Sequence, residues 1–203
     1  MRRFVLAALL LLAGMAGAAA TEPQKLAPGQ SLHGHFDQQR YLKGFAKPLH
    51  STGSFVLVGG TGLIWRGETP FQNVTVLSAA GILQSADGKE TMHLAASRMP
   101  MLGRFYQVLN GALSGDADAL TQDFKLARQG SGEGWQLILT PVRPDDPILG
   151  QIAAITVRGT RFVDSVDIEK AGGDHDELHF SDQIAGATAL SPEEQSLFDG
   201  VAK

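Results

Sequence analysis

The chain contains no cysteine, which excludes disulfide bonds, thiolate metal ligands and a cysteine-linked lipid anchor. Its stability must therefore come from packing. Aromatic residues make up only 7% of the 203 residues. After the first twenty residues, no apolar run approaches the ~18 residues that a membrane-spanning helix needs. We therefore expect a protein that is not integral to a membrane.

The first twenty residues have the pattern of a secretory signal. Arg2 and Arg3 precede the apolar run from Phe4 to Leu12, and Ala18-Ala19-Ala20 precede Thr21 in the arrangement of an A-x-A cleavage site. The apolar run is too short to span a bilayer. We predict a signal peptide over residues 1–20, cleavage after Ala20, and one exported domain over residues 21–203.

The charge balance of the mature chain disfavours nucleic acid as a partner. Of the 17 basic residues, Arg2 and Arg3 lie in the signal, so the mature chain sets 15 basic against 21 acidic residues, a net charge of −6. Its 183 residues can bury ~70% of the surface of the unfolded chain, which suffices for one core. We expect a monomer that binds no nucleic acid.

Strand patterns dominate both halves of the sequence. The segment from Ser31 to Lys43 alternates, with Leu32, Gly34 and Phe36 on one face and the neighbouring histidines on the other. We predict ten strands, at residues 31–43, 48–58, 63–67, 71–78, 81–84, 124–128, 134–142, 148–158, 162–170 and 177–181. Since strands and helices do not alternate, a parallel sheet is disfavoured. We predict a mainly β fold with some α structure: an unclosed antiparallel β-barrel, or half-barrel, with a helical lid on its concave side.

Two segments have helical patterns. Pro100 to Leu113 carries apolar residues at helical spacing and is followed by Gly115 as a stop signal. Residues 115–120 are expected to form a capped turn or a short second helix. Ser191-Pro192-Glu193-Glu194 is a capping box with proline at the first helical position, which predicts a short helix through Phe198.

The glycine-rich stretch Gly59-Gly60-Thr61-Gly62 allows two interpretations. A nucleotide-binding loop would open a helix of ten or more residues, but Gly67 and Pro70 leave no room for one. A hairpin turn needs only glycines free to adopt unusual backbone angles. We therefore predict a hairpin at this stretch.

Candidates for metal binding and catalysis are weak. His33-x-His35, and Asp174-His175-Asp176 with His179, offer ligand types without a cysteine, and both His33 and His35 lie on the polar face of their strand. There is no G-x-S-x-G motif, and the pairs Asp145-Asp146 and Glu193-Glu194 are explained by a turn and a helix cap. We expect no metal site, no cofactor and no catalytic residue, and hence no enzyme.

The large apolar side chains favour a binding cavity instead. All three methionines after the signal, Met92, Met99 and Met101, lie close together in the sequence, and methionine adapts to irregular apolar shapes. By alternation, the predicted lipid-binding wall residues are Phe36, Phe55, Leu57, Leu63, Trp65, Val76, Leu137 and Leu139. The predicted lid residues are Met101, Leu102, Phe105, Val108 and Leu109. A shift of one residue along a strand would invert each wall assignment.

Several motifs in fixed order resemble one family. They are Phe36-x-Gln38, PLHSTGSFVL from Pro48, Gly62-Leu63-x-Trp65 followed by Thr69-Pro70, VTVLSAAGI from Val74, Trp135-x-Leu137-x-Leu139-x-Pro141, and Ile155-x-Val157. Together, over residues 31–182, they resemble the periplasmic outer-membrane lipoprotein carrier LolA, and more closely its LolA-like branch, which is associated with cell-envelope lipid and polyene pathways.

This resemblance implies a periplasmic carrier without catalysis or cofactor. Such a carrier accepts acyl chains of lipoproteins or other envelope lipids from an inner-membrane donor complex and passes them to an outer-membrane acceptor. In LolA itself an arginine-proline pair just before the Gly/Phe-x-Trp segment ties the lid shut, whereas this chain has Val58-Gly59-Gly60 there. That switch is not carried over; Arg66, Arg98 and Arg104 are the candidates to replace it. A free lipid, glycolipid or polyketide-like chain is therefore as compatible a cargo as a lipoprotein.

The alternative is a non-transport periplasmic interaction scaffold whose core is filled and whose outer face binds envelope proteins. A lipid-modifying enzyme is a third hypothesis.

Overall fold

A computed structural model describes residues 24–98, 120–131, 134–146, 149–186 and 190–201 of the chain. Within these residues, eleven antiparallel strands form one sheet in the order β6-β5-β4-β3-β2-β1-β11-β10-β9-β8-β7. The strands are β1 (Ser31–Tyr41), β2 (Leu49–Val58), β3 (Gly62–Thr69), β4 (Asn73–Ser78), β5 (Gly81–Ala86), β6 (Lys89–Ala95), β7 (Phe124–Ser131), β8 (Gly134–Pro141), β9 (Ile152–Gly159), β10 (Val163–Lys170) and β11 (His175–Gly186).

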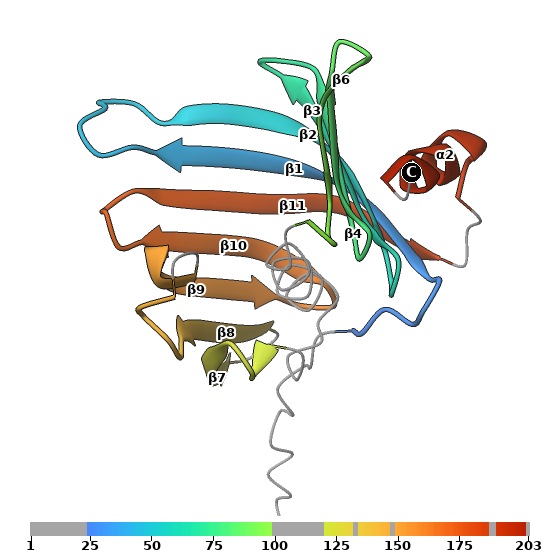
Figure 1. The fold of residues 1–203 in the computed structure, drawn as a ribbon. Helices are drawn as coiled ribbons and strands as arrows, with labels where there is room; N and C mark the ends of the chain where they lie inside the picture. The colour runs from blue at the N-terminus through green and yellow to red at the C-terminus, as the bar shows by residue number, and fades with distance from the viewer. Residues whose placement is uncertain (1–23, 99–119, 132–133, 147–148, 187–189, 202–203) are drawn as a thin grey trace, which may run out of the picture.

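The sheet is strongly curved and does not close. Figure 1 shows β1 and β2 running beside β8 to β11, while β3 to β6 turn across them and form the second arm of the curve. Strands β6 and β7 are the two edges, and they are not paired with each other. The predicted fold class, a mainly β unclosed antiparallel sheet, is confirmed.

The glycine-rich stretch is a hairpin turn, as predicted. It joins β2 to β3, whose pairing begins at Val58 and Gly62. Gly60 adopts a φ of 75°, a left-handed conformation that favours glycine. At Gly59 an added Cβ would lie 2.3 Å from the carbonyl oxygen of Ala27, so this glycine allows the N-terminal segment to cross the turn. The phosphate-binding interpretation is therefore discarded.

The predicted strands differ most from the structure in three places. The edge strand β6 was not predicted, because its sequence KETMHLA carries a weak strand pattern with charged residues at its start. Residues 148–158 were expected to be one strand, but Leu149–Gln151 form the short 3₁₀ helix η2 before β9 begins. Strand β11 is longer than expected and runs to Gly186.

The capping box opens a helix, α2 (Pro192–Val201), as predicted. The backbone N–H of Ser191 donates to Glu194 Oε2 at 2.8 Å, and the N–H of Glu194 donates to Ser191 Oγ at 3.2 Å. Phe198 and Val201 of this helix pack on Val56, Val58, Ile64 and Val76 of the sheet. Helix α2 therefore lies outside the curve rather than on the concave side, where helices were expected (Figure 1).

The helix expected over Pro100 to Leu113 lies outside the described residues. None of the helices in the described part of the chain has the length and hydropathy required to cross a bilayer.

Candidate functional site

The strand register divides the apolar residues between two faces of the sheet. Because directly paired residues of antiparallel strands point to the same face, Leu57, Leu63 and Leu77 form one row across β2, β3 and β4. The adjacent row, Val56, Ile64 and Val76, points to the opposite face. The first row faces the inside of the curve and the second faces α2. Leu57 also pairs with Leu32 of β1, which extends the inner row toward the middle of the sheet.

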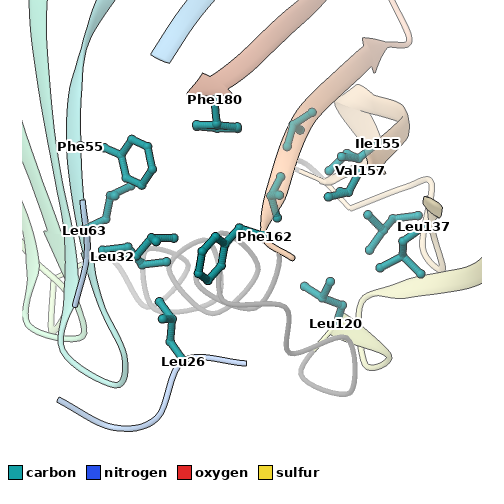
Figure 2. Packing of buried hydrophobic residues seen from close by; sticks show 14 of the residues in the cluster. Leu26, Leu32, Phe55, Leu63, Leu120, Leu137, Ile155, Val157, Phe162 and Phe180 are labelled. Atoms are coloured by element: carbon teal, nitrogen blue, oxygen red, sulfur yellow. The ribbon is translucent and has the colours of Figure 1, made fainter. Parts of the chain in front are cut away.

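The inner face carries one large apolar cluster, to which both arms of the sheet contribute. Figure 2 shows Phe55 and Leu63 on one arm facing Ile155, Val157 and Leu137 on the other, with Phe180 between them. The buried members are Leu26, Leu32, Phe36, Phe55, Leu57, Leu63, Leu120, Phe124, Trp135, Leu137, Leu139, Leu149, Ile155, Val157, Phe162, Val163, Val166 and Phe180. Trp65, Leu126, Ile152, Ile168, Leu178 and Ala185 are partly buried against them.

Four aromatic rings gather near the centre of this face. Phe36 stacks on Trp65, with ring centroids 3.8 Å apart and an interplanar angle of 23°. Phe180 meets Phe55 edge to face at 5.4 Å and Trp65 at 6.2 Å. Such stacked and edge-on pairs add stabilisation beyond that of buried area alone.

Two glycines make room for these rings. A Cβ at Gly34 would lie 2.7 Å from the Phe55 ring, and a Cβ at Gly53 would lie 2.8 Å from the Phe36 ring and 1.9 Å from the carbonyl oxygen of Arg66. In the register, Gly34 pairs with Phe55 and Gly53 pairs with Phe36. Each ring therefore lies over the glycine of the neighbouring strand.

A hollow of about 240 Å³ opens beside the stacked pair. Phe36 and Trp65 form its aromatic part, and its lining is completed by Gln38, Ser51, Gly67, Thr69, Pro70, Phe71 and Asn73. Phe71 is 78% exposed in the turn between β3 and β4. The hollow thus joins the apolar face to solvent at the end of the sheet where β1, β2 and β3 meet their turns.

The other end of the cluster is covered by the N-terminal segment. Leu26 is 9% exposed and belongs to the cluster, where Figure 2 shows it below Leu32 and Phe162. Backbone hydrogen bonds from Gly29 N to Gly59 O (2.8 Å) and from Gln24 N to Arg161 O (2.9 Å) hold this segment against both arms. No role for this segment was predicted from the sequence, but Leu26 closes one end of the apolar face.

A buried carboxylate lies where the inner face becomes polar. Asp176 is 4% exposed and accepts hydrogen bonds from Arg40 Nε at 2.5 Å and from Lys170 Nζ at 2.7 Å. Burial raises the pKa of Asp176, but the hydrogen bonds from Lys170 and Arg40 outweigh it, so that this pKa lies below its ordinary value. The group remains ionised and joins β1, β10 and β11.

The structure brings most of the predicted wall residues together. Six of them are buried in the inner cluster and Trp65 is partly buried against it; the six are Phe36, Phe55, Leu57, Leu63, Leu137 and Leu139. The placement predicted for Val76 is wrong. Val76 lies in the cluster under α2, and its neighbour Leu77 takes the inner position, because the pairing of β4 with β3 sets Leu77 opposite Leu63. The predicted lid residues Met101, Leu102, Phe105, Val108 and Leu109 lie outside the described residues.

Sequence reasoning missed the part of the inner face that β9 to β11 contribute. Phe180, Val166 and Val157 are buried there, and Leu178 packs against them. The alternation Leu178-x-Phe180 and the spacing of Val163, Val166 and Ile168 did indicate strands with one apolar face. That signal was weakened by charged residues between the apolar ones.

Several of the polar candidates have structural partners. His33 Nε2 lies 3.3 Å from Glu194 Oε1 and thereby ties β1 to α2. Burial raises the pKa of Glu194, but hydrogen bonds from Ser191 and the contact with His33 lower it below the ordinary value. Across the described ranges, no cluster of three or more His, Asp or Glu side chains is placed to hold a metal ion.

The fold and this face define a class of protein: an unclosed antiparallel half-barrel whose apolar lining is on the inside of the curve. The chain belongs to the family described as outer membrane lipoprotein carrier protein LolA-like, whose model matches residues 10–179. The predicted family resemblance is confirmed.

The solved structures to which this chain is similar are distant from it in sequence. A LolA superfamily protein from Nitrosomonas europaea is 13% identical, with a TM-score of 0.45, and the match covers 83% of this chain and 90% of that one. An outer membrane lipoprotein-sorting protein domain from Vibrio parahaemolyticus is 9% identical, with a TM-score of 0.41, over 86% and 93% of the two chains. The MucA/MucB complex of Pseudomonas aeruginosa gives 15% identity and a TM-score of 0.46 over 81% of this chain and 54% of that one. No sequence among the curated proteins matches this chain significantly.

Proposed function

We propose that this protein is a periplasmic carrier that binds the acyl chains of lipoproteins or other envelope lipids and shuttles them toward the outer membrane. The observation that carries this proposal is the continuous apolar inner face, which runs from Leu57 and Leu63 on one arm of the sheet to Leu137 and Leu139 on the other. Membership of the LolA-like carrier family supports it. The signal pattern of residues 1–20 supports export.

The physical task of such a carrier is to shelter hydrocarbon from water. Each exposed CH₂ group costs ~0.8 kcal/mol, so a chain of ~16 carbons requires shelter of ~10 kcal/mol to cross the periplasm. A wall made only of aliphatic and aromatic side chains provides this shelter without directional bonds. Release then requires an acceptor site with a still higher affinity.

We assign the wall to Phe36, Phe55, Leu57, Leu63, Trp65, Leu137 and Leu139, with Leu77 in place of Val76. The lid is assigned to Met101, Leu102, Phe105, Val108 and Leu109, on the sequence pattern alone. Catalysis has no part in this role. The donor complex in the inner membrane and the acceptor at the outer membrane are the partners that a carrier requires.

A matched pair of substitutions on the two faces tests the wall. Leu178 is partly buried on the inner face, whereas Ile138 of β8 points to the other face, since it is flanked in the strand by the inner residues Leu137 and Leu139. Leu178→Asn should weaken the binding of a fluorescent fatty acid about tenfold, because a polar amide replaces apolar wall. Ile138→Asn should leave this affinity unchanged.

Both variants are to be checked for an unchanged circular dichroism spectrum before titration. An equal loss of fatty-acid affinity in the two variants, or no binding by the unaltered protein, would contradict the proposed function. The latter result would favour the scaffold with a filled core.

A further inference from the structure

The hollow beside Trp65 has a lining that differs from the rest of the inner face. Its stacked rings, Phe36 and Trp65, are accompanied by amide and hydroxyl side chains from four strands: Gln38, Ser51, Thr69 and Asn73. Among the residues that the structure describes, its lining includes no acidic, basic or histidine side chain. The nearby cation Arg40 is engaged by Asp176.

The polar side chains of the hollow are held in place by hydrogen bonds with one another and with adjoining groups. Ser51 Oγ donates to Gln38 Oε1 at 3.5 Å, and the hydroxyls of Thr52 and Thr69 are hydrogen-bonded. Asn73 Nδ2 donates to the carbonyl oxygen of Phe71 at 3.2 Å. The Asn73 amide lies over Gly67, where an added Cβ would come within 2.7 Å of it. These groups are therefore positioned before any molecule binds, which lowers the entropic cost of binding.

Trp65 brings to the hollow a hydrogen-bond donor that is not engaged within the described part of the chain. Its ring is only partly buried, and its indole N–H donates to no group in the described part of the chain, whereas the other tryptophan, Trp135, donates to the carbonyl oxygen of Thr160 at 2.7 Å. A tryptophan that lies between an apolar interior and solvent usually directs its N–H to a polar partner. In the hollow, that partner would come from a bound molecule.

We propose that this hollow binds the head group of the cargo, and that this head group is neutral and carries several hydroxyls. The inference rests on the proposed function, since it places the acyl chain on the adjoining apolar face. Amides and hydroxyls can both donate to and accept from hydroxyl groups, and an aromatic face packs against the C–H bonds of a polyol. A phosphate would require cations or clustered N–H donors, which the described lining does not supply. A glyceryl group and a sugar share the favoured chemistry.

The test compares three single-chain amphiphiles with the same lauryl tail: monolaurin, lauryl maltoside and lauryl phosphate, each below its micelle concentration. Binding is followed by the fluorescence of Trp65 in a Trp135→Phe background, which leaves one tryptophan as reporter. Monolaurin and lauryl maltoside differ in the source of the hydroxyls, glyceryl or sugar. At least one of them should bind more tightly than lauryl phosphate.

Gln38→Leu preserves the size of the side chain and removes its amide. It should weaken the preferred neutral amphiphile about fivefold while changing the affinity for lauryl phosphate less than about twofold. The matched control is Gln136→Leu, at a glutamine on the outer face of β8. This control should change neither affinity.

The outcomes separate the two proposals. If lauryl phosphate binds more tightly than both neutral compounds, or if Gln38→Leu weakens all three equally, the head-group site is wrong and acyl-chain binding stands. If none of the three binds, the acyl-binding function itself is wrong.

Discussion

At the scale of single residues, Gly53 determines where the central aromatic ring lies. It pairs with Phe36, and an added Cβ would lie 1.9 Å from the carbonyl oxygen of Arg66, which is backbone and cannot move aside alone. Gly53→Ala should therefore lower the free energy of unfolding by about 2 kcal/mol or more and displace Phe36 from Trp65. Urea denaturation measures the first effect, and near-UV circular dichroism measures the second.

Gly172→Ala is the matched control for that substitution. Gly172 lies in the turn between β10 and β11, and a Cβ there would meet nothing within 4 Å. The free energy of unfolding of Gly172→Ala should remain within about 0.5 kcal/mol of that of the unaltered protein. Equal stabilities for the two alanine variants would show that the strand pairing at Gly53 is described wrongly.

Asp176 makes stability depend on pH. The pKa of Asp176 in the folded state is below the ordinary carboxyl value. The contribution of this carboxylate to the free energy of unfolding is therefore present above the ordinary value and is lost as the pH falls through the folded pKa. Asp176→Asn should cost about 2 kcal/mol at neutral pH, because Arg40 and Lys170 lose their buried acceptor. The difference in free energy of unfolding between this variant and the unaltered protein should shrink below about pH 4.

Urea denaturation at several pH values measures this difference. A difference that stays constant from neutral to acidic pH would contradict the role of the ionised carboxylate.

Single residues also mark how far the sequence alone could predict the wall. Alternation along β8 correctly put Leu137 and Leu139 on the same face as Phe55 of β2. It failed at Val76, because VTVLS offers apolar residues to both faces and only the pairing with β3 decides between them. Register depends on contacts between strands, which the pattern within one strand does not contain.

At the scale of elements, α2 is a separately capped unit on the outer face. Ser191 and Glu194 satisfy each other's backbone N–H groups, and His33 and Arg66 of the sheet contact Glu194 and Glu193. Ser191→Ala should lower the free energy of unfolding by about 1 kcal/mol. Ser196→Ala, at an exposed position within the same helix, should have no such cost.

Thermal or urea denaturation compares the two serine variants. If Ser196→Ala is as destabilising as Ser191→Ala, the capping box does not hold the helix start. Fatty-acid binding should be equal in both variants, because α2 covers the outer face.

The segment from Pro100 to Leu113 carries the lid prediction. Leu109→Asp should abolish retention of acyl chains while leaving the circular dichroism of the sheet intact, because a charge cannot be buried against hydrocarbon without a partner. Asn110→Asp puts the same carboxylate on the adjacent polar position and should retain the lipid. Unchanged lipid content in Leu109→Asp would reject the lid assignment.

The elements differ in how well the sequence predicted them. The capping box and the glycine hairpin were correctly assigned because their signals are local and specific. The edge strand β6 was missed, because an edge strand needs neither an apolar face of its own nor a strong pattern. The side of the sheet that α2 covers depends on the whole curve of the sheet, which no local pattern encodes.

At the scale of the whole molecule, the sheet presents a more apolar inner face than a solvated antiparallel sheet would carry. In the described residues that face is bordered by Leu26 at one end and by the hollow at Trp65 at the other. Such a face is costly in water unless something covers it. The proposed carrier function would require a lid and a cargo to cover this face in turn.

Native mass spectrometry of the protein isolated from the cells that naturally produce it tests this central claim most directly. We expect a population heavier than the bare chain by the mass of one acyl-bearing molecule, which is released intact when the protein is denatured. Lauryl maltoside must be absent from the purification, so that no added amphiphile occupies the face. A single species at the mass of the bare chain, from cells that produce the partners of the carrier, would contradict the account.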